Sequence, residues 1–119
     1  EQGARKVVRL PVSIAGHSPL MEDAAAEFKD LLAETPFSEP AVPLVANATA
    51  RPLISVDSIR EALGKQLTLP VYWEDSLCWM IGQGVNRFVE VGPGEVLTGL
   101  LKRIDSTVER MSTAQALSG

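Results

Sequence analysis

Segments typical of strands alternate with segments typical of helices along this chain, and the alternation limits the folds open to it. The apolar run at residues 6–12 predicts a strand, because it contains several β-branched side chains. Apolar residues then recur at helical spacing over residues 19–33, where Pro19 suits the first turn of a helix. This order predicts an α/β architecture with mainly parallel strands and right-handed crossovers.

The rest of the chain continues the pattern. Three prolines within residues 35–43 predict a loop. Asp57 is expected to cap the second helix, and Gly84 to end the third. The other predictions are a strand over 44–47, helices over 58–67, 73–83 and 96–104, a strand over 87–91, a turn over 92–94 and a polar, lightly packed tail from residue 106.

The composition is that of a globular protein and argues against membrane and nucleic-acid partners. With 119 residues, 45% of them apolar, the chain is long enough for one domain with a core. No apolar stretch approaches the roughly 20 residues that span a bilayer, and the first residues do not resemble a secretory signal. A net charge of −4 argues mildly against nucleic acid as a partner, because binding to its phosphates needs clustered Lys and Arg. The single cysteine, Cys78, allows no disulfide within the chain, so we expect a cytoplasmic protein.

The only histidine, His17, lies between the first predicted strand and the first predicted helix. α/β proteins often present catalytic side chains where a strand ends. Imidazole is also the one side chain that, unperturbed, exchanges its proton near neutrality. His17 is therefore a candidate general base, although a lone histidine is more often structural than catalytic.

Four motifs, in order, carry a resemblance to a known family. They are LPVSIAGHSPLM at residues 10–21, VANATA at 45–50, QL at 66–67 followed by PVYW at 70–73, and FVEVGPGEVLTGL at 88–100. Together they resemble the malonyl-CoA:acyl carrier protein transacylases, which also form the acyltransferase modules of fatty acid and polyketide synthases. The resemblance covers about residues 3 to 104, and it is to the C-terminal portion of the family's proteins only.

The resemblance implies an arrangement of subdomains. Residues 1–12 would end a small ferredoxin-like subdomain and contribute its last strand. Residues 13–105 would be the C-terminal part of a hydrolase-like large subdomain with mainly parallel strands, and residues 106–119 a polar C-terminal tail. The first six residues resemble the last turn of a helix without its beginning, which predicts that the chain is a fragment.

The resemblance also implies a reaction and the residues that carry it. Family members transfer malonyl from CoA to the phosphopantetheine thiol of acyl carrier protein through a malonyl-serine ester, a ping-pong mechanism. His17 matches the histidine that acts as general base and acid, and Gln66 matches the residue whose main-chain carbonyl orients that ring. The alternative for Gln66 is a polar helix end with no such role. The substrates would be malonyl-CoA and phosphopantetheinylated carrier protein, with no bound cofactor and no metal.

The family's nucleophile, a serine in a G-H-S-x-G motif, is absent from these residues, and neither Ser13 nor Ser18 lies in such an elbow. We therefore predict that this chain is a portion of an acyltransferase and is inactive without the N-terminal part. Its expected partners are that N-terminal part, malonyl-CoA and acyl carrier protein. Two alternatives stay open. One is a non-catalytic fragment that binds carrier protein or acts as a scaffold, and the other is an unrelated α/β binding module. Gly16 stands where family members often carry Phe or Ser, so the sequence does not predict acyl selectivity.

Other residues have structural interpretations. The turn at 92–94 lacks the length and the lysine of a phosphate-binding loop. Cys78 is expected to be an inert buried thiol. The cations Arg87, Lys102 and Arg103 would either meet an acidic carrier protein or lie at solvated helix ends. Strands without neighbours predict exposed apolar faces. Four large side chains are expected in the core, namely Trp73, Trp79, Met80 and Phe88.

Overall fold

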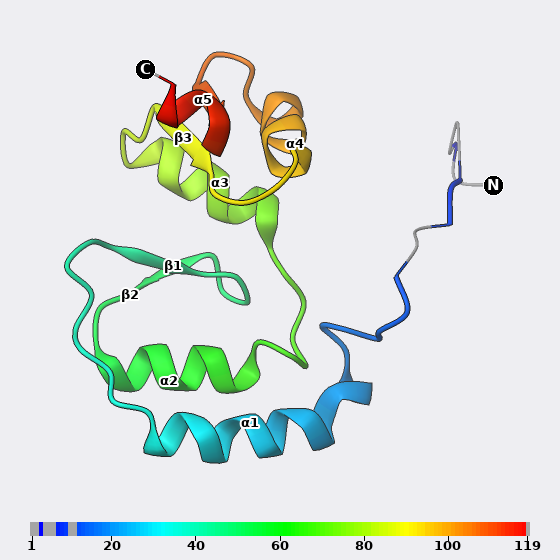
Figure 1. Ribbon diagram of the computed structural model, residues 1–119, viewed down its shortest axis with the longest axis vertical. Coiled ribbons are helices and arrows are strands. Elements are labelled where there is room, and N and C mark those ends of the chain that lie inside the picture. The colour runs from blue at the N-terminus through cyan, green and yellow to red at the C-terminus, as the bar shows by residue number, and fades with distance from the viewer. Residues whose placement is uncertain (1–2, 4–6, 10–11, 119) are drawn as a thin grey trace.

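The computed structural model describes residues 3, 7–9 and 12–118, and it shows a mixed α/β arrangement (Figure 1). Helices α1 and α2 lie side by side at one end, a β hairpin lies beside α2, and the remaining helices and strands gather at the other end. The elements are the 3-10 helix η1 (Pro19–Met21), α1 (Glu22–Glu34), β1 (Leu44–Ala46), β2 (Arg51–Leu53), α2 (Val56–Lys65), α3 (Trp73–Gly82), β3 (Arg87–Glu90), α4 (Val96–Ile104), β4 (Glu109–Ser112) and α5 (Thr113–Leu117).

Helices α1 and α2 pack through small and branched apolar side chains. Ala25 and Leu32 of α1 and Ile59 of α2 are buried. Arg60 joins the two helices further, because its guanidinium donates to the carbonyls of Leu32 (3.3 Å) and Thr35 (3.1 Å) at the end of α1. The predicted helix over 19–33 is thus confirmed, with its first turn in the 3-10 form.

The start of α2 corrects one prediction. Ser55, not Asp57, caps this helix, and the helix begins at Val56. The Ser55 hydroxyl accepts from the Ser58 N–H (3.2 Å), while the Ser58 hydroxyl accepts from the Ser55 N–H (3.1 Å). This reciprocal capping satisfies two backbone donors, and it places Asp57 inside the first turn, where a carboxylate still complements the helix dipole.

The prediction of mainly parallel strands is wrong for half of the pairings in the described ranges. β1 and β2 pair antiparallel, with Val45 opposite Pro52, whereas β3 and β4 pair parallel, with Phe88 opposite Arg110. The first pair is joined by the short turn at residues 47–50, which can only reverse the chain. β2 was not predicted, because a proline inside a three-residue run argues against a strand.

The main core lies between α3, α4 and the parallel pair. Leu77, Leu101 and Val108 are buried there. Trp73, Met80 and Phe88 pack against them partly buried, as expected for core residues, and Trp79 is also partly buried. α4 spans the predicted residues and forms the crossover between β3 and β4, while Gly84, at φ +91°, follows the end of α3 as expected. Cys78 is exposed, so the expectation of a buried thiol is wrong.

The predicted loose tail is also wrong, because residues from Ser106 onward form β4 and α5. Val108 and Ser112 are buried, and Thr113 donates to the Glu90 carbonyl (2.9 Å). Small polar residues in this segment form hydrogen bonds with backbone groups at the end of β3. From composition alone, the same residues predict a solvated tail.

The predicted first strand is not formed where the structure describes it. Residues 7–9 and 12 have no strand pairing, and residues 6, 10 and 11 lie outside the described ranges. Val7 is 89% exposed and Val12 64% exposed. An apolar β-branched run indicates a surface that needs covering, but a strand also needs a hydrogen-bonding neighbour, and none of the described strands pairs with it.

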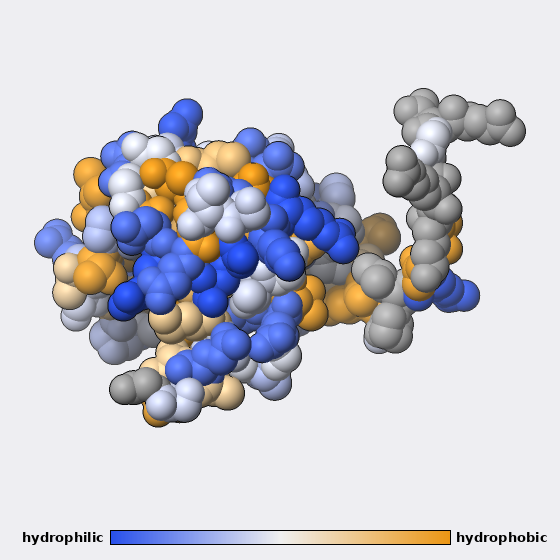
Figure 2. Space-filling model, turned by 90° about the horizontal axis from the view of Figure 1, so that it is seen from above, coloured by the Kyte–Doolittle hydropathy of each residue, from blue (hydrophilic) through white to orange (hydrophobic). Residues whose placement is uncertain are grey.

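Apolar side chains reach the surface at several places, as predicted, and some are visible as orange atoms among blue ones in Figure 2. The most exposed include Val91 (87%), Leu20 (84%), Leu117 (83%) and Ile54 (79%). In the part of the chain that the structure describes, no helix has the length and apolar character needed to cross a membrane.

Candidate functional site

The structure brings together the two residues singled out as site residues. His17 lies in the turn before η1, and its Nδ1 is 2.9 Å from the main-chain carbonyl oxygen of Gln66. A carbonyl oxygen only accepts hydrogen bonds, so Nδ1 carries the proton in this contact. The neutral ring then has its free lone pair on Nε2, as a general base requires.

The Gln66 carbonyl is available because Gln66 ends a helix. Gln66 is the C-cap of α2, and its N–H donates to the Leu63 carbonyl at 3.1 Å. The last carbonyls of a helix have no partner within it, and they carry the negative end of the helix dipole. The N–H groups of Thr68 and Leu69, which follow the helix, both donate to the Lys65 carbonyl instead. The contact therefore depends on the backbone of Gln66 and not on its side chain.

His17 adopts an uncommon backbone conformation. Its φ is +61°, the left-handed region that few residues other than glycine occupy. His17 is exposed, so its ring is accessible from solvent. Strained backbone at an exposed, hydrogen-bonded histidine fits a functional position better than a packing role.

Neither serine beside His17 has the arrangement of a nucleophile. The Ser18 hydroxyl donates to the Ala15 carbonyl (2.7 Å) and accepts from the Leu20 N–H (3.3 Å), and Ser18 is extended (φ −141°). A serine nucleophile instead lies on a sharp strand-to-helix turn with its oxygen free for attack. Ser13 is exposed and lies outside any helix or strand.

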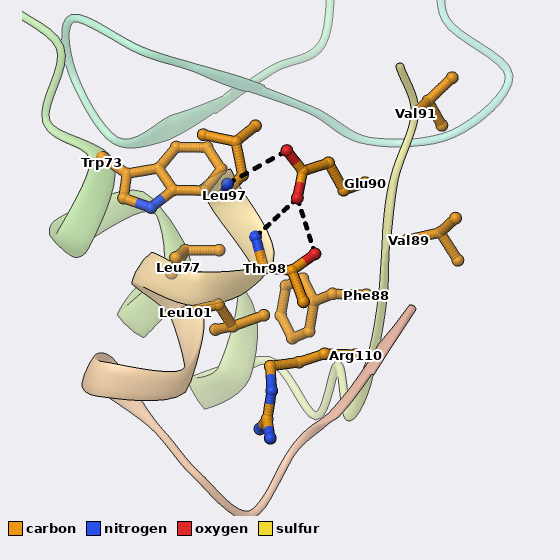
Figure 3. Close-up of a pocket in the computed structure, with 10 residues that line it drawn as sticks. All are labelled: Trp73, Leu77, Phe88, Val89, Glu90, Val91, Leu97, Thr98, Leu101 and Arg110. Atoms are coloured by element: carbon orange, nitrogen blue, oxygen red, sulfur yellow. Dashed lines mark hydrogen bonds between the residues drawn. The ribbon is translucent and has the colours of Figure 1, made fainter. Parts of the chain in front are cut away.

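A second feature is a small apolar cavity, about 120 Å³ in volume, between α3, α4 and β3 (Figure 3). Phe88 and Glu90 point from β3 toward α4, while Val89 and Val91 point the other way. The cavity lining does not include His17 or Gln66. It is thus separate from the histidine site.

Glu90 holds the start of α4 at the edge of this cavity. Its carboxylate accepts from the Leu97 N–H (3.1 Å), the Thr98 N–H (2.7 Å) and the Thr98 hydroxyl (2.7 Å). Two hydrogen bonds that Thr98 donates lower the pKa of the Glu90 carboxyl, the one from the hydroxyl more than the one from the N–H. In the sequence, the one sign of this role is that Glu90 is an acidic residue at a strand end, shortly before a helix whose N-cap residue makes no capping hydrogen bond.

The remaining predicted residues have ordinary surroundings. Arg87 pairs with Glu109 across the parallel strands (2.6 Å), and Lys102 and Arg103 are exposed in the last turn of α4. The stretch 92–94 is a loop, with positive φ at both glycines. Among the residues described, no group of three or more histidine, cysteine or acidic side chains is placed to bind a metal ion.

Comparison with known proteins agrees with the motif resemblance. The chain is 45% identical over 116 residues to the malonyl CoA-acyl carrier protein transacylase of Escherichia coli K12, a match over 98% of this chain and 36% of that protein. No family model matches. In sequence and fold, the chain is similar to the C-terminal portion of the malonyl CoA-acyl carrier protein transacylases.

Solved transacylase structures support the same conclusion. An acyl carrier protein S-malonyltransferase from Vibrio cholerae superimposes with a TM-score of 0.89 at 39% identity, over 98% of this chain and 39% of that one. A malonyl-transacylase solved in complex with a type II polyketide synthase acyl-carrier protein gives 0.90 at 37% identity, over 98% and 38%. The chain thus spans little more than a third of the length of the transacylases it matches.

Proposed function

We propose that this chain supplies the histidine half of a Ser–His malonyl transferase, the serine lying in an N-terminal part outside these residues. The observation that supports this proposal is the 2.9 Å contact between His17 Nδ1 and the Gln66 carbonyl. It leaves Nε2 of the neutral ring as a base, and it joins two residues that match the family's motif.

The proposed reaction uses His17 twice. As the serine oxygen attacks the thioester carbonyl of malonyl-CoA, its proton passes to Nε2, and the C–S bond breaks to release CoA. The protonated ring returns this proton to the leaving sulfur. In the second half, Nε2 takes the proton of the phosphopantetheine thiol, and the sulfur attacks the carbonyl carbon of the malonyl-serine ester. The ester C–O bond breaks, the malonyl group stays on the phosphopantetheine sulfur, and the ring returns the proton to the serine oxygen.

The main-chain carbonyl has a distinct part in this proposal. It orients the ring and complements the charge that the ring gains with a proton, but with a partial rather than a full negative charge. Malonyl-CoA and carrier protein are the proposed substrates, no bound cofactor is invoked, and the proposed location is the cytoplasm. A relative solved in complex with an acyl-carrier protein supports this choice of partner.

The proposal is tested with a chimera in which this chain replaces the corresponding portion of the E. coli transacylase. Malonyl transfer to carrier protein is expected for the chimera and not for the chain alone. His17→Ala is expected to lower the transfer rate by about 10²- to 10⁴-fold, the usual contribution of general acid–base catalysis. A folded chimera that transfers nothing, or full activity in His17→Ala, contradicts the proposal.

The alternative is a non-catalytic fragment that binds carrier protein. Titration with carrier protein, combined with the transfer assay of the chimera, distinguishes it from the transferase. Carrier protein added to the chain alone would bind measurably, and the folded chimera would transfer no malonyl group. Binding by the chain together with transfer by the chimera supports the transferase.

A further inference from the structure

The turn that carries His17 is closed by the side chain of the next residue. The Ser18 hydroxyl donates to the Ala15 carbonyl at 2.7 Å, two residues before the histidine. The same oxygen accepts from the Leu20 N–H at 3.3 Å, and the Ser18 carbonyl accepts from the Met21 N–H at 3.1 Å. One serine thus joins the segment before His17 to the helix after it.

His17 lies inside this closed turn in a conformation that needs support. A left-handed backbone is unfavourable for a residue with a side chain, because Cβ comes too close to the following carbonyl oxygen. It persists where the surrounding structure holds it. Within the part of the chain that the structure describes, Ser18 makes the hydrogen bonds on either side of His17, and the ring contacts the Gln66 carbonyl, 49 positions away.

We propose that Ser18 is a positioning residue, whose hydroxyl holds the His17 turn so that Nδ1 faces the Gln66 carbonyl and Nε2 stays free. The catalytic meaning of this role rests on the proposed function. The orientation of the ring does not, so it is measured separately. Ser18 itself takes no proton and forms no bond to substrate.

A simple helix cap is the competing explanation, and it predicts a different outcome. A cap stabilises the helix that follows it, so its loss lowers the stability of that helix without a particular effect on the ring. Ser112 offers a control at another helix, because it is the N-cap residue of α5, with extended backbone like that of Ser18, and lies far from His17 in the chain.

The test reads the imidazole nitrogens of the full chain by ¹⁵N NMR, above the pH at which the ring loses its charge. Because His17 is the only histidine, a single ring gives the signals. The original chain is expected to show mainly the Nδ1–H tautomer. Ser18→Ala is expected to shift the ring toward the Nε2–H form favoured in water, Ser18→Thr to restore the original signals, and Ser112→Ala to leave them unchanged.

Two results overturn the proposal. One is a Ser18→Ala ring that keeps the Nδ1–H tautomer in a chain that circular dichroism shows to be folded. The other is a tautomer shift of equal size in Ser112→Ala. If Ser18→Ala does not fold, Ser18→Gly replaces it, because glycine is tolerated at a helix cap better than alanine. An inactive chimera with the expected tautomers would refute the proposed function and leave the role of Ser18 intact.

Discussion

The ring of His17 is held by a main-chain atom, so the identity of residue 66 should matter little. Gln66→Ala keeps the carbonyl that accepts from Nδ1 at 2.9 Å. We expect this variant of the chimera to keep malonyl transfer within about twofold, since no reacting group is lost. A loss close to that of His17→Ala would show that the amide side chain takes part. The ring tautomer of Gln66→Ala, read by ¹⁵N NMR, separates the two cases.

Glu90 should make the stability of the folded chain depend on pH. Its pKa is lowered in the folded state by hydrogen bonds from the Thr98 hydroxyl and N–H. A lowered folded pKa means that the stabilisation is present above the unfolded value, about 4.3, and is lost as the pH falls through the folded value. Urea midpoints measured between pH 3 and 7 should therefore fall toward acid less steeply in Glu90→Gln. Parallel curves for the two proteins would contradict this assignment.

At the scale of the element, the start of α2 depends on a reciprocal pair of serines. Ser55→Ala removes the acceptor for the Ser58 N–H and is expected to cost about 1 kcal/mol of unfolding free energy. Asp57→Ala is the matched control, since this carboxylate lies within the first turn and should contribute less. Equal losses of unfolding free energy in the two variants, measured in urea, would contradict the assignment of Ser55 as the cap and favour Asp57.

The contact between α3 and α4 should be the most sensitive part of the main core. Leu101 is 3% exposed and packs with Leu77, which is 2% exposed. Leu101→Ala is expected to cost about 2–5 kcal/mol, because it leaves a cavity as well as losing apolar burial. Leu100→Ala, one position away and 38% exposed, should cost clearly less in the same unfolding measurement. Similar losses for both would mean that Leu100 is covered in solution.

Sequence reasoning predicted the helices well and the strands less well, for a physical reason. Helix α4 was predicted with its exact ends, because its spacing of apolar residues is a property of the helix itself. β2 and β4 were missed, since a short strand depends on its partner and β2 contains Pro52. The contact between His17 and Gln66 came from the family resemblance, and no local pattern indicates it. Glu90 and Ser18 were missed as supporting residues because their hydrogen bonds exist only in the folded chain.

For the molecule as a whole, the exposed apolar side chains are the main observation. Val91 at 87% exposure and Leu20 at 84% are unusual for residues of their type. If an N-terminal part covers this surface, a dye that binds apolar surface should fluoresce more with the chain alone than with the chimera. The isolated N-terminal part of the E. coli protein, added to the chain, should lower that fluorescence. No change on addition, with both proteins folded, would contradict this covering.

The distance along the chain between His17 and Gln66 has a consequence for the order of folding. Closing a loop of 49 residues costs roughly 3.4 kcal/mol in chain entropy, whereas one hydrogen bond returns about 1 kcal/mol. The ring cannot bring the two segments together by itself. The packing of α1 on α2, where Leu32 and Ile59 are buried, supplies the free energy that closes this loop. We therefore expect the histidine to reach its place only once these helices have packed, and a substitution between them to free the imidazole without any change to His17 or Gln66.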